Sequence, residues 1–132
     1  MPVITALYAG LLGLIAIGVA FPAGSLRGKL GISIGDGGNP DLLLAMRRHA
    51  NFVEWVPLAL LLIALLELNG ARHWAVHALG AALVIGRILH PLGLRAETMR
   101  RPERFAGATL SALVTVIASL WLIVLFVQRA MP

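Results

Sequence analysis

The sequence predicts an all-α integral membrane protein whose four spanning helices form an up-down-up-down bundle. Of its 132 residues, 59% are hydrophobic and only 13% are charged, whereas soluble domains carry about 25% charged residues. Mean hydropathy is +0.89. At about 20 apolar residues per crossing, the chain is long enough for four spans with short loops and no separate soluble domain. We therefore expect one membrane domain over residues 1–132.

The first two predicted spans are joined by a glycine-rich loop. The first span, about 3–21, is rich in Gly and Ala, which let neighbouring helices approach closely. The loop ends in Asn39-Pro40, a turn signal. The second span, about 41–68, contains Pro57 and is expected to bend there.

The last two predicted spans follow from similar signals. Asn69-Gly70 is a typical helix stop, and the third span, about 73–94, begins just after it. Pro102 opens the fourth span, about 102–128, at a first-turn position. Because the loops are short, consecutive spans run antiparallel.

The basic residues indicate topology and argue against nucleic acid as a partner. Net charge is +5, but Lys and Arg lie in short segments between apolar runs, mainly in the first and third loops. The excess of basic residues places these loops in the cytoplasm and both termini outside. The chain has no cysteine, which excludes disulfides and thiolate chemistry. Its four histidines do not form a ligand-spaced cluster, so no metal site is expected.

Polar residues inside the predicted spans indicate a site in the cytoplasmic half of the bundle. Arg47, Asn51 and Glu54 share one helical face at i, i+4 and i+7. Arg87 and His90 lie at the same depth on the third span. A charge at bilayer depth costs several kcal/mol, so it persists only beside a partner or a wet cavity.

The polar residues have two interpretations. Arginine binds carboxylates through paired hydrogen bonds, so the cluster suits an anionic ligand. Alternatively, the polar residues only join the helices, with a salt bridge from Arg87 to Glu54 of the same or a neighbouring protomer. Arg48 shares the turn with Arg47 but points elsewhere, and we interpret it as an interfacial charge.

Two motifs resemble those of the MAPEG family, the membrane-associated proteins of eicosanoid and glutathione metabolism. The segment from Arg47 to Pro57 is similar to the family's second-helix pattern Arg-x-x-x-Asn-x-x-Glu-aromatic-x-Pro. The pair Arg87 and His90 resembles its third-helix pattern. The resemblance covers nearly the whole chain in span count, loop lengths and motif order.

The resemblance implies a homotrimer that binds glutathione, as co-substrate, between protomers in the cytoplasmic half of the membrane. An arginine at the start of the fourth helix would stabilise the glutathione thiolate, and it falls on Arg101 or Arg100. A bacterial-type member would lie in the inner membrane among membrane lipids. The residues that match the glutathione-binding positions are Arg27, Arg47, Asn51, Glu54, Trp55, Arg87 and His90.

The function that follows is that of a membrane glutathione transferase or peroxidase-like enzyme, conjugating glutathione to lipophilic electrophiles. One departure from the family pattern bears on this. Eicosanoid-making members carry a Tyr four residues after the His90 position, where this chain has Leu94. The alternative is a non-catalytic protein of the same fold that binds lipids or fatty acids.

Overall fold

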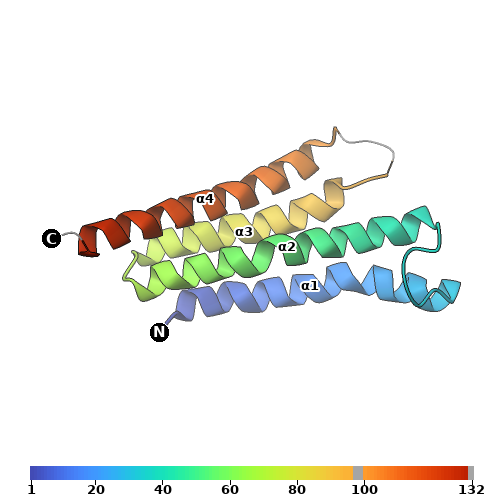
Figure 1. Ribbon diagram of the computed structural model, residues 1–132, viewed down its shortest axis with the longest axis horizontal. Helices are drawn as coiled ribbons and strands as arrows, with labels where there is room; N and C mark the ends of the chain where they lie inside the picture. Colours follow the sequence, from blue (N-terminus) through green and yellow to red (C-terminus); the bar gives the residue numbers. More distant parts are fainter. Residues whose placement is uncertain (97–99, 131–132) are drawn as a thin grey trace.

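The structure is a computed structural model that describes residues 1–96 and 100–130. Its helices are α1 (Val3–Leu30), α2 (Pro40–Leu68), α3 (His73–Gly93) and α4 (Pro102–Ala130). They run antiparallel, with both termini and the α2–α3 turn at one end and the other two connections at the opposite end (Figure 1). Each is long and apolar enough to span a membrane. The predicted all-α four-helix bundle is confirmed.

Helix α1 continues past the predicted span limit at residue 21 as far as Leu30. Pro22 lies inside the helix and does not end it. The helix ends at Gly31, which adopts a left-handed conformation with φ of 66°, a geometry that glycine reaches without a Cβ penalty. A further contact secures the loop that follows, because the Arg27 guanidinium donates to the carbonyls of Ile32 (3.3 Å) and Ser33 (3.1 Å).

Helix α2 begins at the turn that the sequence signals. The Asn39 side chain accepts a hydrogen bond from the Leu42 amide (3.0 Å) and caps the helix, while Pro40 occupies the first turn. The Asn39 cap satisfies one of the backbone N–H groups that a helix start leaves without a partner. Pro40 has no backbone N–H, so one fewer such group needs a partner. The helix includes Pro57 and ends at Leu68, before Asn69.

Helices α3 and α4 pack closely through glycines. A Cβ added at Gly107 of α4 would lie 2.6 Å from the backbone nitrogen of His90. One added at Gly86 of α3 would lie 3.0 Å from the Gly107 carbonyl oxygen, and one at Gly93 would meet the Arg104 backbone. Small residues of this kind let two membrane helices approach backbone to backbone. Helices α3 and α4 therefore form a tight pair.

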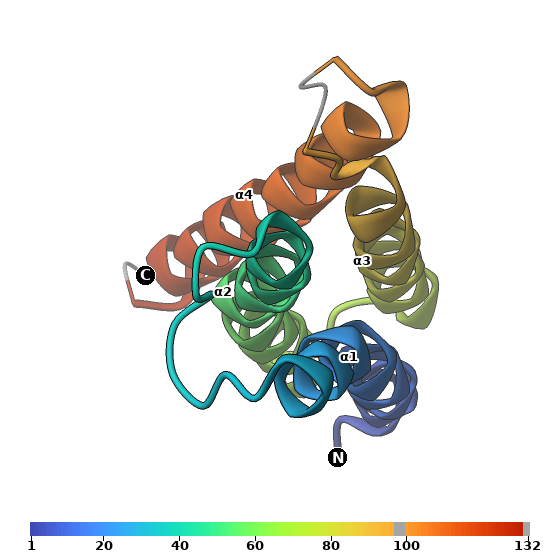
Figure 2. The same ribbon diagram turned by 90° about the vertical axis from the view of Figure 1, so that its right-hand side faces the viewer.

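The apolar core lies between the helices along the length of the bundle. Figure 2 shows α2 in the middle, with α1 on one side and α4 on the other, and α3 beside α1 and α4. Side chains from α1, α2 and α3 are almost fully buried there, among them Leu12, Ile63, Leu66, Val76 and Leu83. Many large apolar side chains on the outer faces are exposed, as expected of a bundle that contacts lipid.

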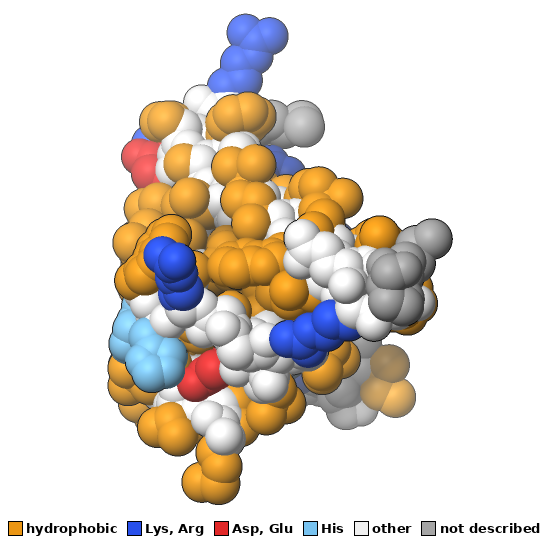
Figure 3. All heavy atoms as spheres, turned by 90° about the vertical axis from the view of Figure 1, so that its left-hand side faces the viewer, with side chains coloured by type: hydrophobic (Ala, Val, Ile, Leu, Met, Phe, Trp, Pro, Cys, Tyr) orange, Lys and Arg blue, Asp and Glu red, His pale blue; other side chains and the backbone are white. Residues whose placement is uncertain are grey.

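Polar contacts fasten the end of the bundle that carries the termini. The Glu67 carboxylate of α2 accepts hydrogen bonds from the amides of Ile4 and Thr5 (both 2.8 Å) and from the Thr5 hydroxyl (2.6 Å). It thus caps α1 in place of a local N-cap side chain. Tyr8 of α1 lies 3.0 Å from His77 of α3. The surface at this end is mostly hydrophobic, with a few separate charged side chains (Figure 3).

Candidate functional site

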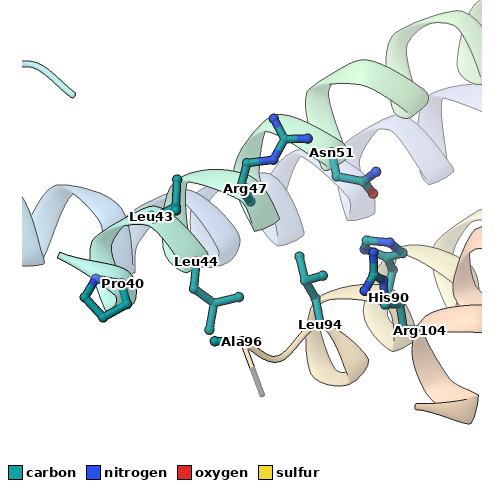
Figure 4. Close-up of a pocket in the computed structure, with 9 residues that line it drawn as sticks. All are labelled: Pro40, Leu43, Leu44, Arg47, Asn51, His90, Leu94, Ala96 and Arg104. Carbon is teal, nitrogen blue, oxygen red and sulfur yellow. The ribbon is translucent and has the colours of Figure 1, made fainter. Parts of the chain in front are cut away.

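A cavity of about 420 Å³ opens at the opposite end of the bundle, between the first half of α2, the end of α3 and the start of α4. Its wall combines apolar side chains with basic and amide groups, and among the described residues it contains no carboxylate. Figure 4 shows Asn51 and Leu44 pointing from α2 toward His90 and Leu94. The lining residues are Pro40, Leu43, Leu44, Arg47, Asn51, His90, Leu94, Ala96 and Arg104.

Arg87 does not line the cavity but contacts Asn51, which does, and its side chain is only 2% exposed. Its guanidinium donates to the Asn51 side-chain oxygen (3.0 Å) and to the Gly107 carbonyl (3.0 Å). Its Nε is buried without a hydrogen-bond partner. Within the described part of the chain, no carboxylate neutralises this charge, so Arg87 and Glu54 form no salt bridge within one protomer. A salt bridge to Glu54 of a neighbouring protomer stays a prediction. A buried cation held only by neutral oxygens favours an anion nearby.

Asn51 and His90 connect this buried charge to the cavity. Because arginine can only donate, the Asn51 oxygen faces Arg87, and its amide NH₂ is directed elsewhere. His90 is 6% exposed and lines the cavity beside the closely packed Gly107. The predicted grouping of Arg87 and His90 with Asn51 is therefore present in the structure.

The arginine that α4 brings to the cavity is Arg104. It is half-buried and lines the cavity on the same side as His90 (Figure 4). Arg100 and Arg101 precede the first residue of α4, are exposed and do not line the cavity. Gly93 explains why Arg104 lies at the cavity, because a glycine there lets the α4 backbone at Arg104 approach the end of α3. The sequence alone does not identify Arg104 as the cavity-lining arginine, because this depends on where α4 begins and on how the helix is rotated about its axis.

The other predicted site residues do not all meet at this cavity. Arg47 lines it, but its guanidinium points away from Leu44 and His90 (Figure 4). Glu54 is exposed and, among the described residues, has no hydrogen bond or ion pair. It is the middle residue of α2, about 20 Å from either end at 1.5 Å per residue. Trp55 is half-buried outside the lining, and Arg27 instead binds its own loop.

Arg48 contributes to the cavity in a way that the sequence does not reveal. Its guanidinium donates to the Leu94 carbonyl through Nε (3.2 Å) and a terminal nitrogen (2.7 Å). The guanidinium is therefore bound to the end of α3, a contact that the prediction of an interfacial charge did not include. No local sequence signal marks this contact, since it joins residues 46 positions apart.

The protein is thus a four-helix membrane bundle with a cationic cavity at one end. The MAPEG family profile matches residues 5–125, and the chain belongs to the MAPEG family. It is 38% identical over 119 residues to the inner membrane protein YecN of Escherichia coli strain K12, covering 89% of this chain and 91% of that protein. The protein of the same name from Escherichia coli O6:H1 matches to the same extent. No solved structure matches the chain.

Proposed function

We propose that the protein is a membrane-bound glutathione transferase that binds glutathione in the cavity between α2, α3 and α4. The observation that carries this proposal is the charge imbalance of the site. Arg47, Arg104 and His90 line the cavity and Arg87 lies behind it, yet none of the described lining residues is acidic. Glutathione offers two carboxylates and an ionisable thiol, and guanidinium groups bind both kinds of anion.

The chemistry asked of the residues is modest. A guanidinium beside the bound thiol favours the thiolate, because an adjacent positive charge stabilises the ionised form. We assign this role to Arg104, since its side chain reaches the cavity. The thiolate sulfur then forms a bond to an electrophilic carbon, and the leaving group departs with its electron pair. The thiol proton passes to water. The lipophilic electrophile would enter from the bilayer past Leu43 and Leu44, which form the apolar side of the wall.

The exposed carboxylate at the middle of α2 supports an assembly of several copies. A lipid-facing charge at that depth costs several kcal/mol, and Glu54 finds no partner among the described residues of its own chain. We propose a homotrimer in which Glu54 faces another copy and takes part in glutathione binding, near its ammonium group. Arg27 and Trp55 would join the site from the same interface. We place the protein in the inner membrane, with the α1–α2 and α3–α4 connections in the cytoplasm by the positive-inside rule.

The proposal is tested by stopped-flow absorbance in the thiolate band on adding glutathione to purified protein. We expect a thiolate signal in the unmodified protein, a loss of most of that signal in Arg104→Ala, and little change in Arg101→Ala. Arg101→Ala is a matched control, because it removes the same charge three residues away from an exposed position. The absence of a thiolate signal in the unmodified protein would overturn the proposal. An Arg104→Ala signal equal to that of the control would overturn the assignment of Arg104.

A second candidate function is lipid or fatty-acid binding without turnover. The observation that favours it is Leu94, which puts an apolar side chain on the cavity wall where a phenol would support eicosanoid chemistry. A fatty acid would place its carboxylate near Arg104 and its chain along the leucines. Thermal unfolding in detergent separates the two functions, since only ligands of the native state raise stability. Stabilisation by fatty acids but not by millimolar glutathione would favour this alternative.

A further inference from the structure

The end of α3 is held by a side chain from a different helix. Arg48 of α2 donates two hydrogen bonds to the carbonyl oxygen of Leu94, from Nε at 3.2 Å and from a terminal nitrogen at 2.7 Å. Leu94 is the C-terminal cap residue of α3, and its carbonyl belongs to the group that helix ends leave without an intrahelical partner. The planar guanidinium fork suits one oxygen with two lone pairs.

The segment that Arg48 holds is one wall of the cavity. Leu94 and Ala96 both line it, and the chain passes from there toward α4. Arg48 itself does not line the cavity. Its effect on any ligand must therefore act through the backbone that it positions.

Few polar contacts cross between α2 and the α3–α4 pair at this end. Among the described residues, two side chains make such hydrogen bonds. Arg87 donates to Asn51 at the inner end of the cavity, and Arg48 donates to Leu94 at its outer edge, which we call the rim. The α3–α4 pair is tightly packed through Gly86, Gly93 and Gly107, so it resists internal adjustment. If the hydrogen bonds from Arg48 to Leu94 are lost, we therefore expect residues 94–96 to move relative to α2.

We propose that Arg48 is a positioning residue that holds the 94–96 wall against α2 and so sets the width of the cavity opening. Its effect on glutathione rests on the proposed function, whereas its effect on the wall does not. Removing the guanidinium should weaken glutathione binding about tenfold, which corresponds to about 1.4 kcal/mol. Because Arg48 makes no contact with the cavity interior, we expect KM to rise by that factor and kcat to stay within about twofold.

The wall is tested directly by a spin label. The chain has no cysteine, so Ala96→Cys gives a single labelling site on the exposed rim. Continuous-wave electron paramagnetic resonance in lipid nanodiscs then reports the mobility of the wall. We expect greater mobility in Arg48→Ala, an intermediate value in Arg48→Lys, which can donate from only one nitrogen, and no change in Arg95→Ala. Arg95 is the matched control, because it is an exposed arginine next to Leu94 for which the described structure shows no such bond.

The outcomes separate this inference from the proposed function. Unchanged mobility in Arg48→Ala would overturn the inference, and so would an equal increase in Arg95→Ala, because charge rather than the hydrogen bonds would then be responsible. If Arg48→Ala does not fold, Arg48→Lys carries the same comparison. A mobile wall together with no glutathione binding by the unmodified protein would refute the proposed function while supporting the positioning role. A fall in kcat with KM unchanged would contradict positioning as the route to catalysis.

Discussion

The contact between Arg87 and Asn51 predicts an unusual order of mutational effects. Replacing Asn51 by Ala removes the acceptor of a guanidinium that is only 2% exposed, and leaves it with the Gly107 carbonyl as its remaining partner. Removing the neutral acceptor of a buried charged donor costs about 1.5–3 kcal/mol. Replacing Arg87 by Met removes the buried charge itself. The Gly107 carbonyl then keeps its hydrogen bond from the Ser111 hydroxyl (3.0 Å), and the Asn51 oxygen can bind cavity water.

We therefore expect Asn51→Ala to lower the free energy of unfolding by about 2–3 kcal/mol, and Arg87→Met to change it by about 1 kcal/mol or less. Arg87→Met should at the same time abolish the stabilisation of the protein by glutathione. Unfolding is measured by titrating dodecyl sulfate into ligand-free protein in mixed micelles.

Asn69→Ala is the matched control for the loss of an asparagine side chain. Asn69 also accepts from an arginine, Arg129 (2.6 Å), but this contact is exposed, so its loss should cost about 1 kcal/mol or less. If Arg87→Met destabilises the protein as much as Asn51→Ala does, the buried guanidinium is a net stabiliser. The uncompensated charge of Arg87 would then not be the source of the instability of Asn51→Ala.

Three further predictions concern the rest of the bundle. Gly107→Ala should destabilise the protein by about 1–3 kcal/mol in the same titration, because the new methyl would meet α3 backbone, whereas Gly28→Ala, with open space around it, should not. Glu67→Gln should accelerate hydrogen exchange in the first turn of α1, since it weakens the bonds that cap this helix; unchanged exchange would argue against capping. In intact bacteria, an impermeant maleimide should label Arg72→Cys and not Ser33→Cys, and the reverse pattern would invert the proposed orientation.

The sequence predicts the architecture well because its signals are local. The apolar runs fix the number of spans, and the turn signals Asn39-Pro40 and Asn69-Gly70 each act over a few residues. The structure has helix ends at both of these turn signals. The limit set near residue 21 differs from the end of α1 because hydropathy marks the lipid-spanning part, whereas the helix continues through polar sequence until Gly31 allows a left-handed turn.

The site is predicted less completely, because its geometry depends on helix rotation and on long-range contacts. Periodicity places Arg47, Asn51 and Glu54 on one face, but that face is wide. Asn51 reaches the cavity, Arg47 lies at its edge and Glu54 faces outward. Arg104 and Arg48 are positioned by contacts with the end of α3, which no spacing rule within α2 or α4 encodes. Glutathione contact by the predicted residues stays a prediction.

The unpaired charges of a single chain complement one another in a way that constrains the ligand. Among the described residues, Arg87 is a buried cation that has no carboxylate partner. Glu54 is an exposed anion at the middle of a span that has no cationic partner. Both are costly in a membrane. If Glu54 simply neutralised Arg87 of another copy, the assembled protein would have no need of a ligand, and its stability should not depend on one. If a zwitterionic anion such as glutathione lies between them, its carboxylates meet the guanidinium groups and its ammonium meets Glu54. Thermal stability of the assembled protein should then rise with glutathione, and Glu54→Gln should reduce that rise in stability without abolishing it, because only the ammonium contact is lost.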